Sequence, residues 1–443
     1  MKMGEVPMER SRPGQRIAVI GSGIAGLATA WLLARRHRVV LFESAERLGG
    51  HTNTVDVEVD GQALAVDTGF LVFNRRTYPN LCAMFATLGV EAVESEMSFA
   101  VSLAEPELEW AGSDLGTVFG QPRNLLRPAF IGMLRDIMRF NRVATHMAAG
   151  AAEVPALSLG DYLDRERYGQ AFRDWYLLPM AAAIWSCPTR TMLHYPLATF
   201  VRFCHNHGLL QVFDRPQWLT VRGGAREYVR RIAAQLDEVR TGCAVHAVAR
   251  DADGVWVHLR DGVERFDQVV LACHSDQALS LLGSDASTEE RHILGAVRYQ
   301  DNVAVLHTDA ALLPRRRRLW SAWNYLAGSG GIDSRPVSVS YLLNRLQPLP
   351  VARPLVVSLN PFRLPAAESV LKTIHYAHPV FDHAAIAAQG ALRDIQGVRN
   401  TWFAGAWTGY GFHEDGLSSA LAVVERLGAT VPWREPAACM VGA

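Results

Sequence analysis

The feature that most constrains the fold lies at residues 16–36, where the apolar run RIAVI passes directly into GSGIAG and then into LATAWLLARR. This order is typical of a β-strand, a glycine turn and an α-helix. Gly21 permits a tight turn, Gly23 lets backbone approach a pyrophosphate, and Gly26 lets the helix pack closely on the strand. The helix N-terminus offers free N–H groups to phosphates. The predicted dinucleotide contacts in this loop are Gly21, Ser22, Gly23, Ile24, Ala25 and Gly26.

A second predicted strand, RVVLF at residues 38–42, ends in Glu43. An acid at the end of this strand is where a ribose 2′-hydroxyl is bound in dinucleotide-binding βαβ units. The combination of strand, glycine turn, helix, strand and acid is much more specific than the glycine pattern alone. We therefore expect Glu43 to bind the ribose of a dinucleotide.

Three further segments favour FAD over NAD. A Gly-Gly pair within RLGGH follows the second strand, VDTGF ends another predicted strand with a small residue, and TWFAG at residues 401–405 is a strand that leads into GYGFHEDG. These backbone-exposing positions suit a longer cofactor that lies against the protein. The further predicted contacts are Ser44, Arg47, Gly49, Gly50, His51, Thr52, Gly69, Phe70, Gly405 and Ala406.

The chain resembles the flavin-containing amine oxidase superfamily, which includes phytoene-desaturase-like and protoporphyrinogen-oxidase-like enzymes. The resemblance covers residues 16–428 and is carried by GSGIAGL, ERLGGHTNT, VDTGF, VRGGAREYVRRIAAQL, VVLACHSDQALSLL and FAGAWTGYGFHEDG. A narrower likeness, in GYGFHEDG and YAHPVF, is to bacterial NAD/FAD-binding flavoproteins and to the oxidase-like N-terminal region of plant cyclopropane fatty acid synthases. It implies an FAD cofactor and a discontinuous fold.

The sequence departs from the superfamily pattern in two places. Relatives often carry Arg where this chain has His51, so we expect pyrophosphate contacts to rely more on backbone. Relatives also usually have an acid just after FAG, where this chain has Ala406 and Trp407. Glu414 or Asp415, just downstream, would then replace that carboxylate.

The C-terminal motif is expected to meet the flavin. A helix starting near Leu417 would aim its N–H groups at the ring, while Gly411 and Gly416 give the backbone access. His413 is either a general acid or base beside the ring or a structural hydrogen-bond donor, and both roles remain open. The predicted contacts in this motif are Gly411, Phe412, His413, Gly416 and Leu417.

The predicted fold class is α/β, with a discontinuous Rossmann-like FAD-binding domain and an inserted mixed α+β substrate domain. The FAD-binding domain is expected to comprise residues 16–90, 216–290 and 391–430, with Val245 contacting adenine through its backbone. The substrate domain is expected to comprise 91–215 and 291–390, between a disordered N-terminus at 1–15 and a tail at 431–443. The aromatic residues of the insertions are interpreted mainly as core.

Charge and cysteine usage exclude several classes. A net charge of zero, with 44 basic and 44 acidic residues, removes the basic bias of a nucleic-acid-binding protein. The six cysteines show no metal-like spacing, so no metal site is expected. No secretory h-region or long apolar run is present, which predicts a cytoplasmic protein. The arginine run 315–318 with Trp320 and Trp323 indicates either a solvated loop or peripheral contact with the inner membrane face.

The predicted function is hydride transfer between FAD and an apolar substrate. The alternative is an amine oxidase. Amine-oxidising relatives place a lysine in the substrate domain, and this chain offers only Lys372 for that role. The resemblance to the region fused with cyclopropane synthases implies a fatty-acyl lipid, to be desaturated or reduced. A second alternative is a non-catalytic FAD-binding partner of a lipid methyltransferase.

Overall fold

The computed structural model describes residues 14–185, 189–211, 215–330 and 337–434. Most of the predicted N-terminal segment 1–15 and of the predicted tail 431–443 lies outside these described residues. The described start of the tail is packed, because Trp433 stacks on Trp31 with ring centroids 6.2 Å apart.

The opening segment folds as the glycine pattern predicts, into strand β1 (Arg16–Ile20), helix α1 (Ile24–Leu33) and strand β2 (Arg38–Phe42). These strands belong to a five-stranded sheet with the order β10-β2-β1-β14-β20, in which every neighbouring pair is parallel. Its other strands are β10 (Glu238–Arg240), β14 (Gln268–Leu271) and β20 (Thr401–Phe403). Three distant parts of the sequence therefore build one sheet.

Alternating residues of β1 supply two separate hydrophobic cores. Ile17 and Val19 pack on the side of helices α1 and α15 (His413–Arg426), whereas Ala18 and Ile20 belong to the core on the other face. The period of two in a buried strand places these neighbours on opposite faces. The second face is covered by a three-stranded sheet and helix α11, with the elements β11 (Ala247–Asp251), β12 (Gly254–Leu259), β13 (Gly262–Phe266) and α11 (Ser275–Leu282).

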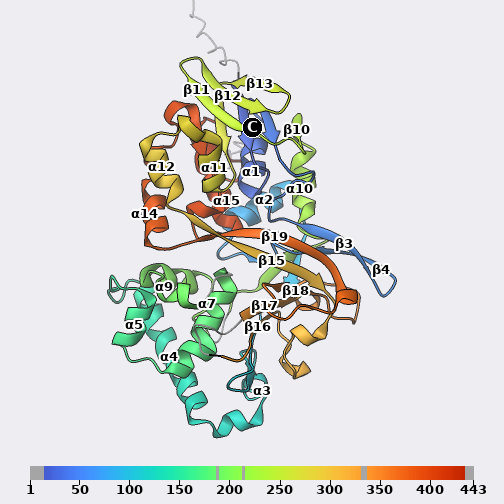
Figure 1. Cartoon of the computed structure of the whole chain (residues 1–443), viewed down its shortest axis with the longest axis vertical. Helices are drawn as coiled ribbons and strands as arrows, with labels where there is room; N and C mark the ends of the chain where they lie inside the picture. The colour runs from blue at the N-terminus through green and yellow to red at the C-terminus, as the bar shows by residue number, and fades with distance from the viewer. Residues whose placement is uncertain (1–13, 186–188, 212–214, 331–336, 435–443) are drawn as a thin grey trace, which may run out of the picture.

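A second region lies at the opposite end of the molecule (Figure 1). It contains a seven-stranded sheet with the order β19-β15-β18-β17-β16-β7-β8, antiparallel except for the β16–β7 pair. Its strands are β7 (Phe99–Leu103), β8 (Leu108–Ala111), β15 (Arg298–His307), β16 (Trp323–Ala327), β17 (Val337–Leu342), β18 (Val356–Leu359) and β19 (Val370–Val380). Its longer helices include α4 (Pro128–Ala148), α7 (Leu178–Trp185) and α9 (Leu197–Asn206).

Small sheets connect the two regions. Strand β9 (Trp218–Val221) pairs with β5 (Phe73–Asn74) on one side and β6 (Ala92–Ser95) on the other. Strands β3 (Thr54–Val59) and β4 (Gln62–Asp67) form an antiparallel hairpin that projects from one side of the molecule (Figure 1). Among the described residues, every helix is too short or too polar to cross a bilayer.

Candidate active site

A cavity of about 1190 Å³ lies where the two regions meet. One end is lined by the glycine loop and the carboxyl end of the parallel sheet, and the other by the seven-stranded sheet and helices α7 and α9. The cavity wall contains nearly all of the residues predicted to bind a cofactor. The exceptions are Gly26, Thr52, Gly416 and Leu417.

The glycine loop has the geometry of an anion site. Gly21 has φ +101°, which favours glycine, and a Cβ on Gly26 would lie 1.8 Å from the Gly21 carbonyl oxygen, so Gly26 is required for packing of α1. A Cβ on Gly23 would meet open space. No side chain caps α1, and its first turn carries no acid. The first N–H groups of this buried helix are therefore available to a phosphate.

Glu43 holds the glycine loop in place from the end of β2. Its Oε2 accepts hydrogen bonds from Ser22 N at 2.9 Å and Ser22 Oγ at 2.6 Å, and its Oε1 accepts one from Ala45 N at 2.9 Å. Glu43 also lines the cavity beside Ser44 and Val245. Each carboxylate oxygen can accept more than one hydrogen bond, so binding a ribose hydroxyl is compatible with these contacts.

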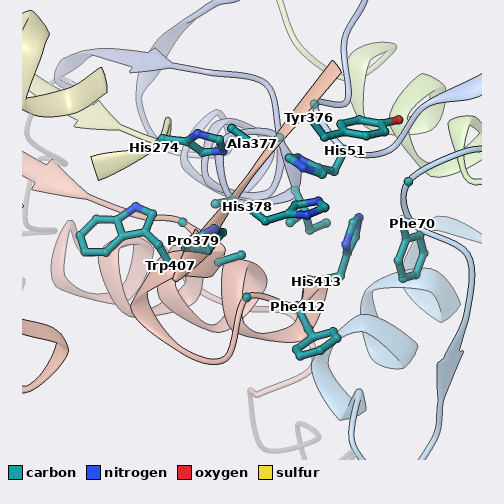
Figure 2. Close-up of a pocket in the computed structure, with 18 of the residues that line it drawn as sticks. His51, Phe70, His274, Tyr376, Ala377, His378, Pro379, Trp407, Phe412 and His413 are labelled. Atoms are coloured by element: carbon teal, nitrogen blue, oxygen red, sulfur yellow. The ribbon is translucent and has the colours of Figure 1, made fainter. Parts of the chain in front are cut away.

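Three histidines gather on the cavity wall beside Tyr376 (Figure 2). His51 stacks on Tyr376 at 4.8 Å between ring centroids and lies 5.2 Å from His378 and 6.2 Å from His274. Burial lowers the pKa of all three rings, for His378 to about 4. The ring at the position where relatives carry arginine is therefore neutral, so it offers a pyrophosphate no positive charge. Sequence reasoning did not single out His274 or His378.

His413 projects from the start of α15 toward Phe70 (Figure 2). The two rings stack at 3.8 Å, and His413 Nε2 lies 2.9 Å from Thr52 Oγ1 and 3.4 Å from the hydroxyl of Tyr228. Burial lowers the pKa of His413 to about 3, so the ring is neutral at physiological pH. Because Thr52 and Tyr228 surround its Nε2, the geometry favours the structural role over acid–base chemistry.

The helix of the C-terminal motif begins at His413, one turn earlier than expected. Asp415 causes this early start, since its side chain accepts a hydrogen bond from Phe412 N at 2.9 Å. Glu414 instead accepts from Asn80 N and Leu81 N, both at 3.0 Å, at the start of α2 (Pro79–Leu88). Neither acid lines the cavity. The expectation that one of them replaces the missing family carboxylate is wrong.

The glycines of the motif have different roles. Gly411 has φ +93° and lines the cavity, as expected. Gly416 faces α1, where an added Cβ would lie 2.9 Å from Ile24 Cγ2, and Leu417 is fully buried in the core. The structure therefore assigns Gly416 and Leu417 to helix packing behind the cavity wall.

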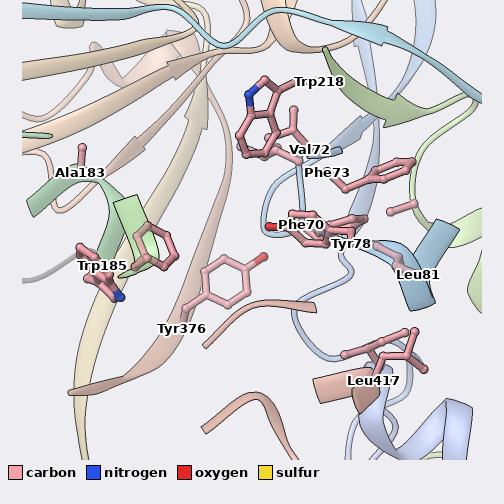
Figure 3. Packing of buried hydrophobic residues seen from close by; sticks show 14 of the residues in the cluster. Phe70, Val72, Phe73, Tyr78, Leu81, Ala183, Trp185, Trp218, Tyr376 and Leu417 are labelled. Carbon is pink, nitrogen blue, oxygen red and sulfur yellow. The ribbon is translucent and has the colours of Figure 1, made fainter. Parts of the chain in front are cut away.

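The far half of the cavity is aromatic and aliphatic. Figure 3 shows Trp185 and Trp218 on different sides of this space, with Tyr376 and Phe70 nearby. These residues lie on elements far apart in the sequence, which is why sequence reasoning placed such aromatics in the core. The wall includes Met97, Ile184, Trp185, Phe203, Leu209, Trp218, Trp323, Tyr341, Val357 and Leu359.

Charged groups are few around the far half of the cavity. Lys372 is exposed on β19 and does not line it. The carboxylates on the wall are Glu43, which binds Ser22, and Asp301, which is exposed on β15. Among the described residues, no group of three or more His, Cys, Asp or Glu side chains could hold a metal ion. The open space at Gly23, the uncapped start of α1 and the cavity volume fit a dinucleotide with a further ring system.

Comparisons with known proteins agree with this geometry. The family model described as flavin containing amine oxidoreductase matches residues 24–293. A carotenoid phi-ring synthase of Streptomyces griseus is 28% identical over 326 residues, which cover 69% of this chain and 59% of that protein. AofH of Mycobacterium tuberculosis, named as a flavin-containing monoamine oxidase, is 28% identical over 267 residues, covering 58% of this chain and 56% of that protein. The chain thus spans less than two thirds of either curated relative.

Solved structures share the fold. A CLA-producing fatty acid isomerase from P. acnes has a TM-score of 0.67 at 16% identity, over 94% of this chain and 99% of that one. The predicted superfamily, α/β fold class and FAD cofactor are confirmed. The chain belongs to the flavin-containing amine oxidoreductase family.

Proposed function

We propose that this oxidoreductase desaturates or reduces a fatty-acyl lipid. The observation that carries the proposal is the apolar far half of the cavity, which offers an acyl chain a continuous aromatic and aliphatic wall. FAD, when bound, supplies the acceptor or donor of the hydride. The likeness to a fatty acid isomerase and to a carotenoid synthase supports an apolar substrate for this chain.

The wall residues would bind and orient the acyl chain. Phe203 comes from α9, Trp323 from β16 and Tyr341 from β17, so two layers of the fold enclose the space. Each buried methylene contributes roughly 0.8 kcal/mol, so affinity should rise with chain length. The same side chains exclude water from the reacting carbon.

His207 is the side chain to which we assign the accompanying proton. Its ring stacks on Phe203 at 3.9 Å, and its Nδ1 lies 3.0 Å from the Phe203 carbonyl oxygen. Because a carbonyl only accepts hydrogen bonds, Nδ1 carries the proton and Nε2 is an acceptor. Burial lowers the pKa of His207 to about 4, so Nε2 is free near neutral pH. His207 lines the cavity, so in desaturation its Nε2 would take the proton of one carbon while the hydride of the adjacent carbon leaves to FAD; reduction would run the same two transfers in reverse.

One observation favours the amine oxidase alternative: the exposed carboxylate of Asp301 lies on the cavity wall. A charged amine loses hydration on entering an apolar space and needs such a partner. Against it, Lys372 lies on the exposed surface outside the cavity. The similarity to a protein named as a monoamine oxidase makes the alternative worth testing directly.

The anaerobic absorbance of the flavin tests the proposal, because a lipid that is desaturated bleaches oxidised FAD and a lipid that is reduced restores the absorbance of pre-reduced FAD. Long-chain acyl lipids, including methyl-branched and unsaturated phospholipids, should exchange hydride with the cofactor, and primary amines and polyamines should not. Trp323→Leu should raise the KM for the longest chains, whereas Trp256→Leu, on β12 outside the cavity, should not. The amine oxidase alternative would be established by a different result: an amine bleaches the flavin, Asp301→Ala abolishes this bleaching, and lipids give no response.

The same assay separates the third possibility. An FAD-loaded protein that no substrate bleaches, and that co-purifies with a lipid methyltransferase, would be a flavin-binding partner of that enzyme. Flavin content measured on each preparation ensures that loss of bleaching is not loss of FAD.

A further inference from the structure

The end of the molecule farthest from the parallel sheet carries large apolar side chains on its surface. We call segment 113–142 the tip; it contains α3 (Leu115–Val118), a 3₁₀ helix at Pro122–Leu126 and most of α4 (Figure 1). Single exposed apolar residues are ordinary, but a gathering within one segment marks an interaction surface. The exposed apolar residues of the tip are Leu115 (77%), Leu125 (54%), Leu126 (86%), Ile131 (45%) and Met138 (57%).

The 3₁₀ helix buries polar side chains and exposes apolar ones, which is the reverse of an ordinary protein surface. Gln121 and Asn124, three residues apart on one face, are buried, while Leu125 and Leu126 point outward. Gln121 Oε1 accepts a hydrogen bond from Glu109 N at 3.0 Å, and Asn124 Nδ2 donates one to Glu109 O at 3.2 Å. These buried amides hold the leucines in their exposed position.

Helix α4 continues the surface. Phe130 and Phe140 pack into the core from one face. On the other face the exposed residues alternate between apolar and basic at spacings of four, three and four. They are Ile131, Arg135, Met138 and Arg142.

The arginine run 315–318 folds against the tip. Arg316 Nη1 pairs with Oε2 of buried Glu109 at 2.6 Å, Arg315 N donates to Glu109 Oε1 at 2.7 Å, and Arg318 donates to the Gly120 carbonyl. The run is therefore anchored to β8 and, through Arg318, to the tip, and three of its arginine residues remain exposed. These are Arg315, Arg317 and Arg318.

The two tryptophans that suggested a membrane interface have other roles. Trp320 donates its indole N–H to the Pro314 carbonyl at 2.8 Å and packs against a small buried cluster. Trp323 lines the cavity. The apolar anchors at this end of the molecule are thus the leucines of the tip.

The tip has a net positive charge, with Arg123 paired to Glu107 beside the tip and Arg139 paired to Asp136. It holds five arginines and two acids, Asp114 and Asp136. Asp114 caps α3 through Thr117 N at 2.8 Å, and Asp136 is buried and accepts from Gly169 N at 2.9 Å. The acids are therefore occupied within the fold, whereas Arg135 and Arg142 face solvent.

We propose that the tip docks on an anionic lipid surface. Leu125 and Leu126 enter the acyl layer, and the surrounding arginines bind lipid phosphates. A protruding apolar element surrounded by basic residues suits an anionic bilayer, because the leucines contact the acyl chains and the arginines contact the anionic headgroups. The inference does not depend on the proposed function: a membrane-docked enzyme of this family could act on any substrate.

Vesicle co-sedimentation of the FAD-loaded full-length chain tests the proposal. The protein should sediment with phosphatidylglycerol-containing vesicles, much less with pure phosphatidylcholine, and binding should fall as salt is raised. Leu125→Ser with Leu126→Ser should weaken binding at least tenfold. Arg135→Gln with Arg142→Gln should weaken binding and reduce its salt dependence.

Matched controls separate docking from general stickiness or misfolding. Val263→Ser with Leu364→Ser removes exposed apolar residues outside the tip and should leave vesicle binding unchanged. Turnover of a detergent-dispersed substrate should be the same in all variants, since none of these residues lines the cavity. No sedimentation with anionic vesicles overturns the proposal. The tip would instead be a surface for self-association if the protein does not bind vesicles and is a dimer in sedimentation velocity, and if Leu125→Ser with Leu126→Ser converts this dimer to a monomer.

Discussion

Glu414 provides a sharp test of the site geometry, because sequence and structure assign it different tasks. The sequence pattern suggests a carboxylate that contacts the cofactor, whereas the structure places it on the start of α2. Its Oε1 accepts from Asn80 N at 3.0 Å and Asn80 Nδ2 at 2.7 Å, and its Oε2 accepts from Leu81 N at 3.0 Å. Glu414→Ala would leave two backbone N–H groups of α2 without this partner.

The expected loss of stability follows from those contacts. A hydrogen bond to a charged group contributes about 1.5–3 kcal/mol, and losing a helix cap costs about 0.5–2 kcal/mol. Glu414 is half-buried, so water replaces part of the interaction. We expect Glu414→Ala to lower the unfolding free energy by about 2–3 kcal/mol, measured by urea titration with far-UV circular dichroism. Glu414→Gln should lie between the variant and the wild type, because it keeps one acceptor oxygen.

A matched control lies on the same helix. Glu425 makes an exposed ion pair with Arg434, so Glu425→Ala should cost less than about 1 kcal/mol. FAD affinity, measured by quenching of flavin fluorescence, should change little in either variant. The reasoning would be refuted by a Glu414→Ala protein of unchanged stability that binds FAD at least tenfold more weakly, since that result would put the carboxylate at the cofactor.

Three further predictions concern the glycine loop, proton transfer by His207 and the raised pKa of the buried acid Asp67. Gly23→Val should fold but purify without yellow colour, because a side chain there enters open cavity space, whereas Gly26→Val should lower thermal stability as well, because its Cβ would strike the Gly21 carbonyl; equal stability of the two variants would contradict this distinction. His207→Phe should slow lipid turnover while leaving flavin content unchanged, and wild-type turnover should fall below about pH 4, where the ring becomes protonated; a pH profile identical in both proteins would exclude His207 from proton transfer. Asp67 is buried, and burial raises its pKa to about 6 from 3.8 in the unfolded chain, so the folded state retains a proton that the unfolded state loses. The contribution of Asp67 to stability should therefore decline by on the order of 3 kcal/mol as pH rises from about 4 to 6, so in urea titrations the stability of Asp67→Asn should rise relative to that of the wild type over this range.

The parts of the fold that could be read from the sequence are those fixed by local geometry. The spacing of Gly21 and Gly23 predicts the turn after β1, and the run at 38–42 has the composition of a buried strand. Strand β20 shows the limit of such reasoning, because the predicted strand at 401–405 ends at Phe403. Strand composition therefore predicts the presence of a strand better than the residues at which it begins and ends.

The substrate half of the site was not predictable in the same way. Trp185, Trp218 and Trp323 come from a helix and two strands of different sheets, and they line one cavity only in the folded molecule. In the sequence each looks like an ordinary core aromatic, and by burial Trp185 and Trp218 are core residues. Whether a buried aromatic faces another side chain or an enclosed cavity depends on tertiary packing, for which hydrophobic pattern carries no signal.

The motif GYGFHEDG combines local and remote determinants in one helical turn. Asp415 binds the backbone three residues away, which sequence reasoning can anticipate from capping preferences. Its neighbours instead meet residues more than 300 positions away: His413 meets Thr52 and Glu414 meets Asn80. Gly416 in turn lets α15 approach Ile24 at the start of α1. The helix that lines the cavity therefore also fixes α1 and α2, so the geometry of the cofactor end and the packing of the cofactor region depend on the same eight residues.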